Sequence, residues 1–164
     1  MELNTRGRYA VMAMADLAKY GHDGSVSLST IAQRQQISLD YLEQLFLKLR
    51  RAGLVESVRG RHGGYKLGRA AGEIFVAEVM SAVEEGTRMT RCLGEDSAGC
   101  LGESRCLTHD LWTALGEQIE SFLSGVSLKD VIEGLPASVG VARVAHGAAA
   151  AGTVTAARIA RPTQ

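Results

Sequence analysis

Residues 27–53 decide the fold of this chain, and they read SLSTIAQRQQISLDYLEQLFLKLRRAG. Ser27 or Ser29 can cap a short helix over residues 29–36, because a serine hydroxyl accepts a hydrogen bond from a first-turn N–H group. Ser38 can cap a second helix over residues 39–52, which ends where Gly53 supplies a left-handed conformation. The second helix carries its large apolar side chains at helical spacing, at Leu42, Leu45, Phe46 and Leu49. Two helices joined by so short a turn predict a helix-turn-helix.

The periodicity changes directly after this motif. Residues 54–59, LVESVR, and residues 65–67, YKL, alternate as strands do, and the turn GRHGG lies between them. This pattern predicts a β-hairpin with a basic tip, and a helix-turn-helix followed by such a hairpin is a winged helix. A helix over residues 5–20, ended by Gly21, precedes the motif, and a short helix over residues 74–84 follows it. We therefore predict a mainly α fold.

Charge is segregated along the chain, although 18 basic and 18 acidic residues cancel overall. Residues 1–69 hold 11 basic and 6 acidic residues, whereas residues 70–135 hold 4 basic and 12 acidic residues. This asymmetry favours a first part that faces nucleic acid and a second part with another task. An apolar content of 46% excludes wholesale disorder, and the charged N-terminus and short apolar runs argue against a signal peptide or a membrane span. We expect a cytoplasmic protein with no membrane partner.

All three cysteines lie in a glycine-rich, weakly periodic segment, residues 85–108, whose length in a compact domain favours a functional role. A long helix is predicted from Thr108 to about residue 124, and Ser127 and Asp130 have capping-box spacing for a last short helix. The long helix carries an apolar stripe of Leu111, Leu115, Ile119, Phe122 and Val126, widened by Trp112 and Leu123. The stripe is either core packing or a dimer seam. Its length and its large residues favour a homodimer.

Four metal-binding side chains have the spacing C-x7-C-x5-C-x2-H, at Cys92, Cys100, Cys106 and His109. Thiolates select zinc, copper(I) or iron–sulfur clusters, and imidazole is compatible with each. The paired C-x2-C sequences typical of structural zinc sites are absent, and the longer gaps suit a bulkier group. On residues alone, an iron–sulfur cluster and a zinc ion stay open about equally, and a chain without a bound metal is a third alternative.

Polar and basic side chains surround the predicted helix-turn-helix. Tyr41, Glu43, Gln44 and Lys48 project away from the apolar stripe of the second helix, where they can meet base edges in a major groove. Arg59, Arg61 and His62 at the hairpin tip suit a minor groove or its phosphates, and Arg6, Arg8, Arg50 and Arg51 suit phosphate contacts. These features predict double-stranded DNA as the partner. The sequence offers no glycine-rich phosphate loop after a strand, no C-x-x-C and no evident nucleophile, so we expect neither an enzyme nor a small-molecule substrate.

The chain resembles the IscR family of winged-helix regulators, which respond to iron–sulfur clusters. The resemblance is carried by residues 5–11 (TRGRYAV), 36–46 (QISLDYLEQLF), 53–60 (GLVESVRG), 63–65 (GGY), 91–92 (RC), 106–109 (CLTH) and 111–112 (LW). It implies a homodimeric repressor or activator, expected to control iron–sulfur cluster assembly genes, with a [2Fe–2S] cluster on Cys92, Cys100, Cys106 and His109. Two alternatives are a regulator that senses nitric oxide or redox state with a different cluster, such as a [4Fe–4S] cluster, and a DNA-binding protein stabilised by zinc. The resemblance also nominates Ser38, Tyr41, Glu43, Gln44, Arg59 and Gly60 as DNA contacts.

Together these features divide the chain into four parts. We expect a winged helix-turn-helix DNA-binding domain over residues 1–84 and a cluster-binding loop over residues 85–108. A dimerisation helix and a short terminal helix follow over residues 109–135, and a flexible Ala/Gly-rich tail over residues 136–164. The chain departs from the family pattern in three places. The first two cysteines are separated by seven residues where the family has five, and the wing tip reads Gly-Arg-His-Gly-Gly where the family tends to Gly-Pro-Gly-Gly-Gly. Asp40 stands where the family has a small polar residue.

Overall fold

The computed structural model describes residues 5–22, 24–60, 63–83 and 106–136, and its fold is mainly helical with one two-stranded antiparallel hairpin. The predicted fold class is therefore confirmed. Most of residues 85–108 and nearly all of the tail lie outside the described residues. The elements, in chain order, are α1 (Thr5–Tyr20), α2 (Leu28–Gln35), α3 (Leu39–Arg51), β1 (Val55–Val58), β2 (Gly64–Leu67), η1 (Ala71–Glu73), α4 (Val76–Ala82), α5 (His109–Ser124) and α6 (Leu128–Glu133).

The helix-turn-helix forms as the sequence predicts, from α2 and α3. Ser27 is the cap of α2, since its hydroxyl accepts a hydrogen bond from the Thr30 N–H at 3.2 Å. The helix stops at Gln36, which adopts a left-handed conformation with φ 55°. The predicted stripe of α3 is buried in full, and Gly53 follows the helix with φ 72°. The N–H groups of Gly53 and Leu54 return to the carbonyls of Arg50 and Leu49, which completes a Schellman motif.

The hairpin pairs Val55 with Leu67 and Val58 with Gly64, as the alternating sequence predicts. Its base is attached to the rest of the domain in two ways. Tyr65 exchanges backbone hydrogen bonds with Val26, the residue before the cap of α2, at 2.8 and 2.9 Å. The Tyr65 ring also packs edge-on against Phe46, with 4.9 Å between ring centroids. These contacts fix the hairpin relative to α3.

The main core lies between α1, α2, α3, the hairpin and α4, and it includes Leu128 at the start of α6. The short helix predicted over residues 74–84 is shorter in the structure, where α4 begins only at Val76. The two residues before it, Ile74 and Phe75, are extended rather than helical. The Leu128 N–H donates to the Ile74 carbonyl and the Val76 N–H donates to the Val126 carbonyl, each at 2.9 Å. This short bridge joins the beginnings of α4 and α6. It also corrects the predicted stripe, because Val126 lies beyond α5 and is buried against Val76 and Met80.

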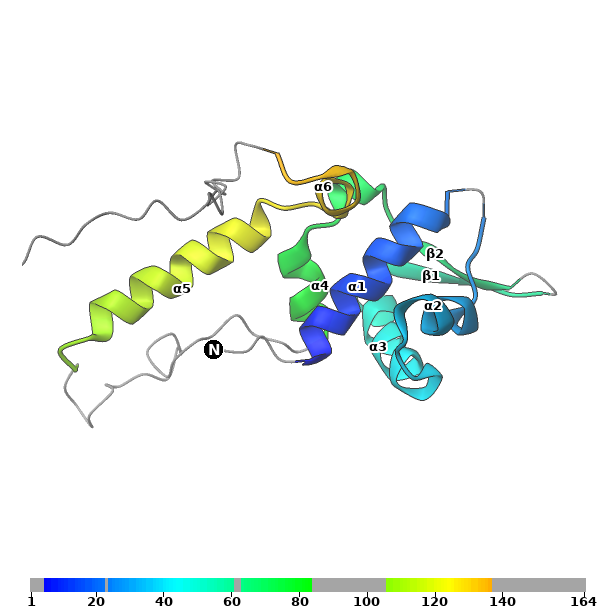
Figure 1. Cartoon of the computed structure of the whole chain (residues 1–164), viewed down its shortest axis with the longest axis horizontal. Coiled ribbons are helices and arrows are strands. Elements are labelled where there is room, and N and C mark those ends of the chain that lie inside the picture. Colours follow the sequence, from blue (N-terminus) through cyan, green and yellow to red (C-terminus); the bar gives the residue numbers. More distant parts are fainter. Residues whose placement is uncertain (1–4, 23, 61–62, 84–105, 137–164) are drawn as a thin grey trace, which may run out of the picture.

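Figure 1 shows α5 projecting away from the body that contains the helix-turn-helix and the hairpin. The helix packs mainly against α4, and Gly116 is its one buried residue among those described. Thr108 occupies the position before α5, but its side chain makes no capping hydrogen bond. Every helix in the described part of the chain lacks the length or the apolar content that a membrane span requires.

The capping box of α6 supports a first prediction. The buried Ser127 hydroxyl accepts from the Asp130 N–H and donates to the Asp130 carboxylate at 2.6 Å, while the Ser127 N–H donates to the same carboxylate oxygen at 2.9 Å. Ser127→Ala should therefore lower the free energy of unfolding by about 1 kcal/mol. Chemical denaturation measures this loss, and Ser81→Ala on the exposed face of α4 is the matched control. Equal stabilities for both variants would contradict the cap.

Glu78 supports a prediction for acid. Its carboxylate accepts from the Phe75 N–H at 2.9 Å and pairs with Arg69 at 2.8 Å, and these two donors lower its pKa from the usual 4.5. A lowered folded-state pKa contributes stability above pH 4.5 that is lost as pH falls toward the folded value. We expect Glu78→Gln to be less stable than the parent protein near pH 6, with a difference that shrinks below pH 4.5. A difference that stays constant across this range would show that the carboxylate charge is not involved.

Candidate nucleic-acid interface and metal-ligand turn

The α2–α3 pair and the hairpin lie at one end of the molecule, and α5 projects at the other (Figure 1). The buried side of α3 holds Leu42, Leu45, Phe46 and Leu49, so its opposite side faces outward. Glu43 and Gln44 are both exposed on that side, and Lys48 is half-buried. The structure thus places Glu43 and Gln44, two of the four side chains that we expect to meet base edges, on an accessible face of the helix, whereas the prediction that Tyr41 projects away from the core is wrong.

Tyr41 differs from its neighbours because it is half-buried and packs against the core. Its ring meets the ring of Tyr9 on α1 edge-on, with a centroid separation of 6.1 Å and an interplanar angle of 83°. The guanidinium carbon of Arg8 lies 5.6 Å from the centroid of the Tyr9 ring. An exposed cation on α1, Arg8, is therefore held next to the start of α3 through two tyrosine rings in edge-on contact.

The first turn of α3 departs from expectation at Ser38. This residue has the extended backbone of an N-cap, with φ −61° and ψ 142°, but within the described structure its side chain makes no capping hydrogen bond. The prediction that Ser38 caps α3 is therefore confirmed for its position, since Ser38 is the N-cap residue, but the expected bond from its hydroxyl is not formed. Ser38 is exposed. Leu39, which the sequence analysis did not nominate, is 39% exposed beside it. Its position in the first turn of the helix expected to meet base edges is a signal that could have nominated Leu39 as a DNA contact, since apolar side chains contact thymine methyl groups.

The wing begins at Arg59 and Gly60, which are both exposed. Gly60 has φ 118°, a conformation that favours glycine, and its carbonyl accepts from the Gly63 N–H at 2.9 Å. Arg61 and His62 lie outside the described residues. Of the cations expected to contact phosphate, Arg8, Arg50 and Arg51 are exposed and Arg6 is half-buried.

Cys106 and His109 form one turn at the start of α5. The His109 N–H donates to the Cys106 carbonyl at 3.1 Å, and the Cys106 Sγ lies 3.6 Å from the Thr108 hydroxyl. Cys106 is a free, half-buried thiol, and the half-buried His109 is the first residue of the helix. A thiolate and an imidazole in one turn are a donor pair suited to zinc or to an iron–sulfur cluster. Cys92 and Cys100 lie outside the described residues, so the convergence of the four ligands stays a prediction.

A buried acid in α1, Asp16, is a feature that the sequence pattern does not predict. The Asp16 side chain has no solvent exposure, and it binds Arg34 and Gln35 at the end of α2. Hydrogen bonding to Asp16 raises the pKa of the Arg34 guanidinium above its usual value. On a helical wheel an aspartate counts as a surface residue, and its partners lie 18 and 19 positions away, so periodicity gave no signal.

The outer face of α5 is apolar and open to solvent. Leu111 is 60% exposed, and Trp112, Leu115 and Phe122 are each 37% exposed. Ile119 and Leu123 on the same side are half-buried. Core packing accounts for one edge of the stripe, because Leu123 packs against the buried cluster of Val76, Met80 and Val126. The more exposed side chains of the stripe leave the dimer seam as a prediction. We call these six residues the α5 stripe below.

Comparison with known proteins assigns the family. The profile of the Rrf2 family, described as an iron-dependent transcriptional regulator, matches residues 3–134. The HTH-type transcriptional regulator IscR of Xenorhabdus nematophila is 56% identical over 133 residues, which are 81% of this chain and 80% of that protein. The IscR of Photorhabdus laumondii is 54% identical over 132 residues, which are 80% of this chain and 79% of that protein.

Solved structures agree with this assignment. T. potens IscR has a TM-score of 0.65 and 37% identity, over 81% of this chain and 87% of its own. CymR, the global cysteine regulator of B. subtilis, has a TM-score of 0.68 and 32% identity, over 81% of this chain and 97% of its own. These relatives are regulators and not enzymes, which confirms that expectation for this chain. The chain belongs to the IscR group within the Rrf2 family and is a DNA-binding transcription regulator.

Proposed function

We propose that this chain binds DNA as a homodimer and that an iron–sulfur cluster on Cys92, Cys100, Cys106 and His109 governs that binding. The observation that carries the proposal is the turn in which Cys106 and His109 lie together at the start of α5, in a chain 56% identical to an IscR regulator. The proposal keeps the expected division into a DNA-binding domain (1–84), a cluster loop (85–108), a dimerisation region (109–135) and a tail (136–164).

For the DNA-binding end, α3 enters the major groove and the hairpin tip reaches the adjacent minor groove or its phosphates. Glu43 and Gln44 are exposed on the outward face of α3, where Gln44 can pair with adenine and Glu43 can accept from a cytosine amino group. The Ser38 hydroxyl and the Tyr41 ring flank them in the first turn. Arg59 and Gly60 at the start of the wing contact the minor groove, as we propose also for Arg61 and His62, and Arg8, Arg50 and Arg51 bind the DNA backbone on either side.

Glu43 is proposed as the residue that rejects wrong DNA sequences. Its exposed carboxylate repels the DNA phosphates, and only a hydrogen bond from a base amino group at the correct position offsets that repulsion. Glu43→Ala should reduce discrimination between the preferred duplex and single-base variants by about 1–3 kcal/mol, chiefly by tightening binding to the wrong duplexes. Fluorescence anisotropy with matched duplexes measures both affinities. Glu133→Ala removes the same charge from exposed α6 and serves as the control. Unchanged discrimination in Glu43→Ala would place Glu43 on a merely solvated face.

For the cluster, the ligands of this chain are three thiolates and one imidazole, of which Cys106 and His109 lie in one turn. The resemblance favours a [2Fe–2S] cluster, and a [4Fe–4S] cluster or zinc would use the same donors. When bound, the cluster supplies a centre that is sensitive to iron supply and to redox state. His109 is the first residue of α5, so its position and that of Cys106 determine how the helix starts.

For the dimer, the α5 stripe gives the seam. A helix of 16 residues is about 24 Å long, and large apolar side chains along such a length are seldom left open to water in a monomer. A second copy of α5 offers a matching apolar face, as a two-fold interface requires. Since α5 follows the cluster loop directly, a change at its first turn alters the spacing of the two α3 helices on DNA. Half-sites one helical turn apart make that spacing important for affinity.

The test of the cluster is anaerobic purification with iron, sulfide and zinc quantified, for the parent protein and for Cys92→Ala and His109→Ala. We expect iron and sulfide in near-equal amounts in the parent and a loss of both in Cys92→Ala. His22→Ala is the matched histidine control, since His22 is exposed two residues after the end of α1. Mössbauer spectra separate a [2Fe–2S] from a [4Fe–4S] cluster. Stoichiometric zinc without iron or sulfide would overturn the proposal in favour of a zinc-stabilised DNA-binding protein.

A further inference from the structure

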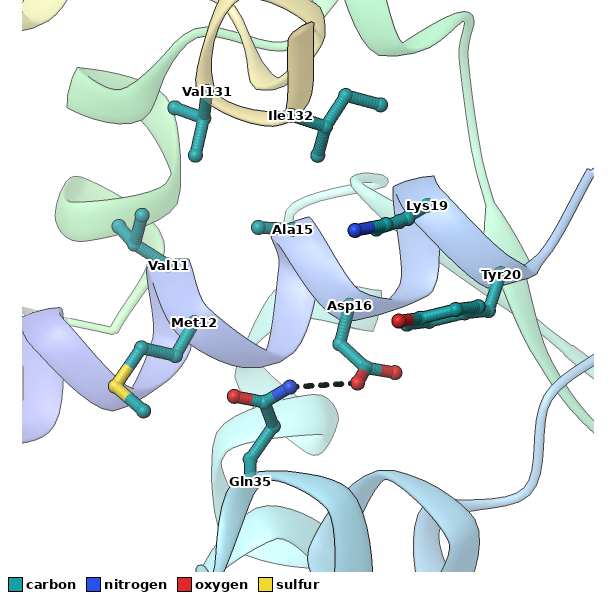
Figure 2. Close-up of a pocket in the computed structure, with 9 residues that line it drawn as sticks. All are labelled: Val11, Met12, Ala15, Asp16, Lys19, Tyr20, Gln35, Val131 and Ile132. Carbon is teal, nitrogen blue, oxygen red and sulfur yellow. Dashed lines mark hydrogen bonds between the residues drawn. The ribbon is translucent and has the colours of Figure 1, made fainter. Parts of the chain in front are cut away.

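A buried carboxylate joins α1 to the helix-turn-helix. Among the described residues Asp16 is the one acidic side chain buried in the core, and every hydrogen bond that the structure gives its carboxylate comes from the last two residues of α2. Figure 2 shows Gln35 directed at Asp16 beneath α1, in a groove of about 370 Å³ that α6 borders on its other side. A buried charge is tolerated only when its hydrogen-bond partners are well placed. The Asp16 carboxylate therefore holds the side chains of Arg34 and Gln35 in position.

The geometry is a fork on both carboxylate oxygens. Asp16 Oδ2 accepts from Arg34 Nε at 2.9 Å and from Gln35 Nε2 at 2.7 Å. Asp16 Oδ1 accepts from Arg34 Nε at 3.2 Å and from Arg34 Nη2. The Arg34 guanidinium carbon also lies 4.4 Å from the centroid of the Tyr20 ring, one helical turn after Asp16 on α1. Arg34 is thus held by a carboxylate and by an aromatic face of the same helix.

The fork acts on the turn that leads into the reading helix. Arg34 and Gln35 are followed at once by Gln36, which at φ 55° is the one non-glycine residue with a positive φ in the described structure. Non-glycine residues adopt this conformation rarely, so the turn needs support from its surroundings. Ile37 is buried two residues after the fork, and α3 begins at Leu39. Asp16 therefore fixes the end of α2 four residues before the helix that meets DNA.

We infer that Asp16 is a positioning residue for DNA recognition: through Arg34 and Gln35 it sets the direction in which α3 leaves the turn. This inference rests on the proposed function. Base readout depends on hydrogen bonds with narrow angular tolerance, whereas phosphate contacts through long cationic side chains tolerate small rotations. Loosening the fork should therefore cost specific binding far more than non-specific binding. Lysine in place of Arg34 keeps the charge but cannot form the two-oxygen fork.

The test uses full-length protein and two probes: a duplex that the parent protein selects from a random library, and a scrambled duplex of the same composition. Dissociation constants are normalised to the active protein fraction. For Asp16→Asn, Arg34→Lys and the double variant, we expect at least a tenfold loss of affinity for the selected duplex. Affinity for the scrambled duplex should change less than about threefold. The double variant should lose about as much affinity for the selected duplex as each single variant, because all three break the same interaction between Asp16 and Arg34.

Two controls separate positioning from plain destabilisation. Arg69→Lys makes the same exchange in the exposed Arg69–Glu78 ion pair and should leave both affinities unchanged. Leu17→Ala weakens the core from the residue next to Asp16, and its folded fraction should keep the full preference for the selected duplex. Should Asp16→Asn fail to fold, Arg34→Lys and Gln35→Ala provide the same comparison, since neither side chain is buried in the core.

Three results would overturn the inference. Equal losses on both duplexes in Asp16→Asn would make the fork a source of stability alone. A loss on both duplexes confined to Arg34→Lys, with a shallower salt dependence, would make Arg34 a phosphate contact. An unchanged preference in all variants would show that the turn needs no fork. A parent protein that selects no duplex overturns the proposed DNA recognition itself, which distinguishes the two failures.

Discussion

Replacing Leu115 and Phe122 together by glutamate is expected to convert the proposed dimer to a monomer and to lower operator affinity at least about 100-fold, or about 2.7 kcal/mol. Both side chains are 37% exposed on α5, and four of them would be buried across a two-fold seam. Burial of one large apolar side chain contributes about 1.5–3 kcal/mol, and a carboxylate in its place must be desolvated. Sedimentation equilibrium measures the association, and fluorescence anisotropy measures operator binding.

The control for this double variant is Ser121→Glu, which adds a charge at an exposed position of α5 outside the stripe. It should remain dimeric and keep its operator affinity. The helical content of the double variant should also match that of the parent protein, because neither side chain is in the core of the described structure. A double variant that stays dimeric would refute the stripe as the seam.

The second large effect is expected at Phe46, where alanine should lower the free energy of unfolding by about 3–5 kcal/mol. Phe46 is fully buried on the inner side of α3, and its ring supports Tyr65 at the base of the wing. Removing the ring leaves a cavity between the reading helix and the hairpin. Denaturant titration at fixed protein concentration measures the loss, since the proposed dimerisation would make apparent stability depend on concentration.

Leu47 offers a matched control, because it is the next residue on α3 and is 41% exposed. Leu47→Ala should change stability by no more than about 0.5 kcal/mol. Similar losses for the two variants would mean that the inward and outward faces of α3 have been assigned wrongly. The proposed DNA-facing position of Glu43 and Gln44 would then also be wrong.

The sequence predicts the parts of the fold that depend on local periodicity. The apolar spacing of α3, the glycine that follows it and the alternation of the hairpin each have one structural solution, and all three are confirmed. The errors arise where a tertiary contact overrides a local pattern. Ile74 is spaced like a helical residue, yet its carbonyl accepts from the Leu128 N–H and its backbone is extended. Val126 continues the spacing of α5, yet it is buried with Val76 and Met80.

The candidate site was predictable to a different degree in each part. The outward face of α3 follows from its buried face, so Glu43 and Gln44 could be placed without coordinates. The placement of Cys106 and His109 in one turn follows from their spacing of three residues at a helix start. Asp16 could not be found in this way, because its function depends on two partners from another helix. Buried polar contacts between distant residues leave no periodic signal in one sequence.

The measurement that bears most directly on the proposed regulation is operator affinity, determined anaerobically, for cluster-loaded protein, cluster-free protein and Cys92→Ala. We expect the loaded protein to differ from the other two by at least about tenfold on one promoter or more, and the cluster-free protein to match Cys92→Ala. Equal affinities for all three proteins on every promoter would contradict cluster control of DNA binding.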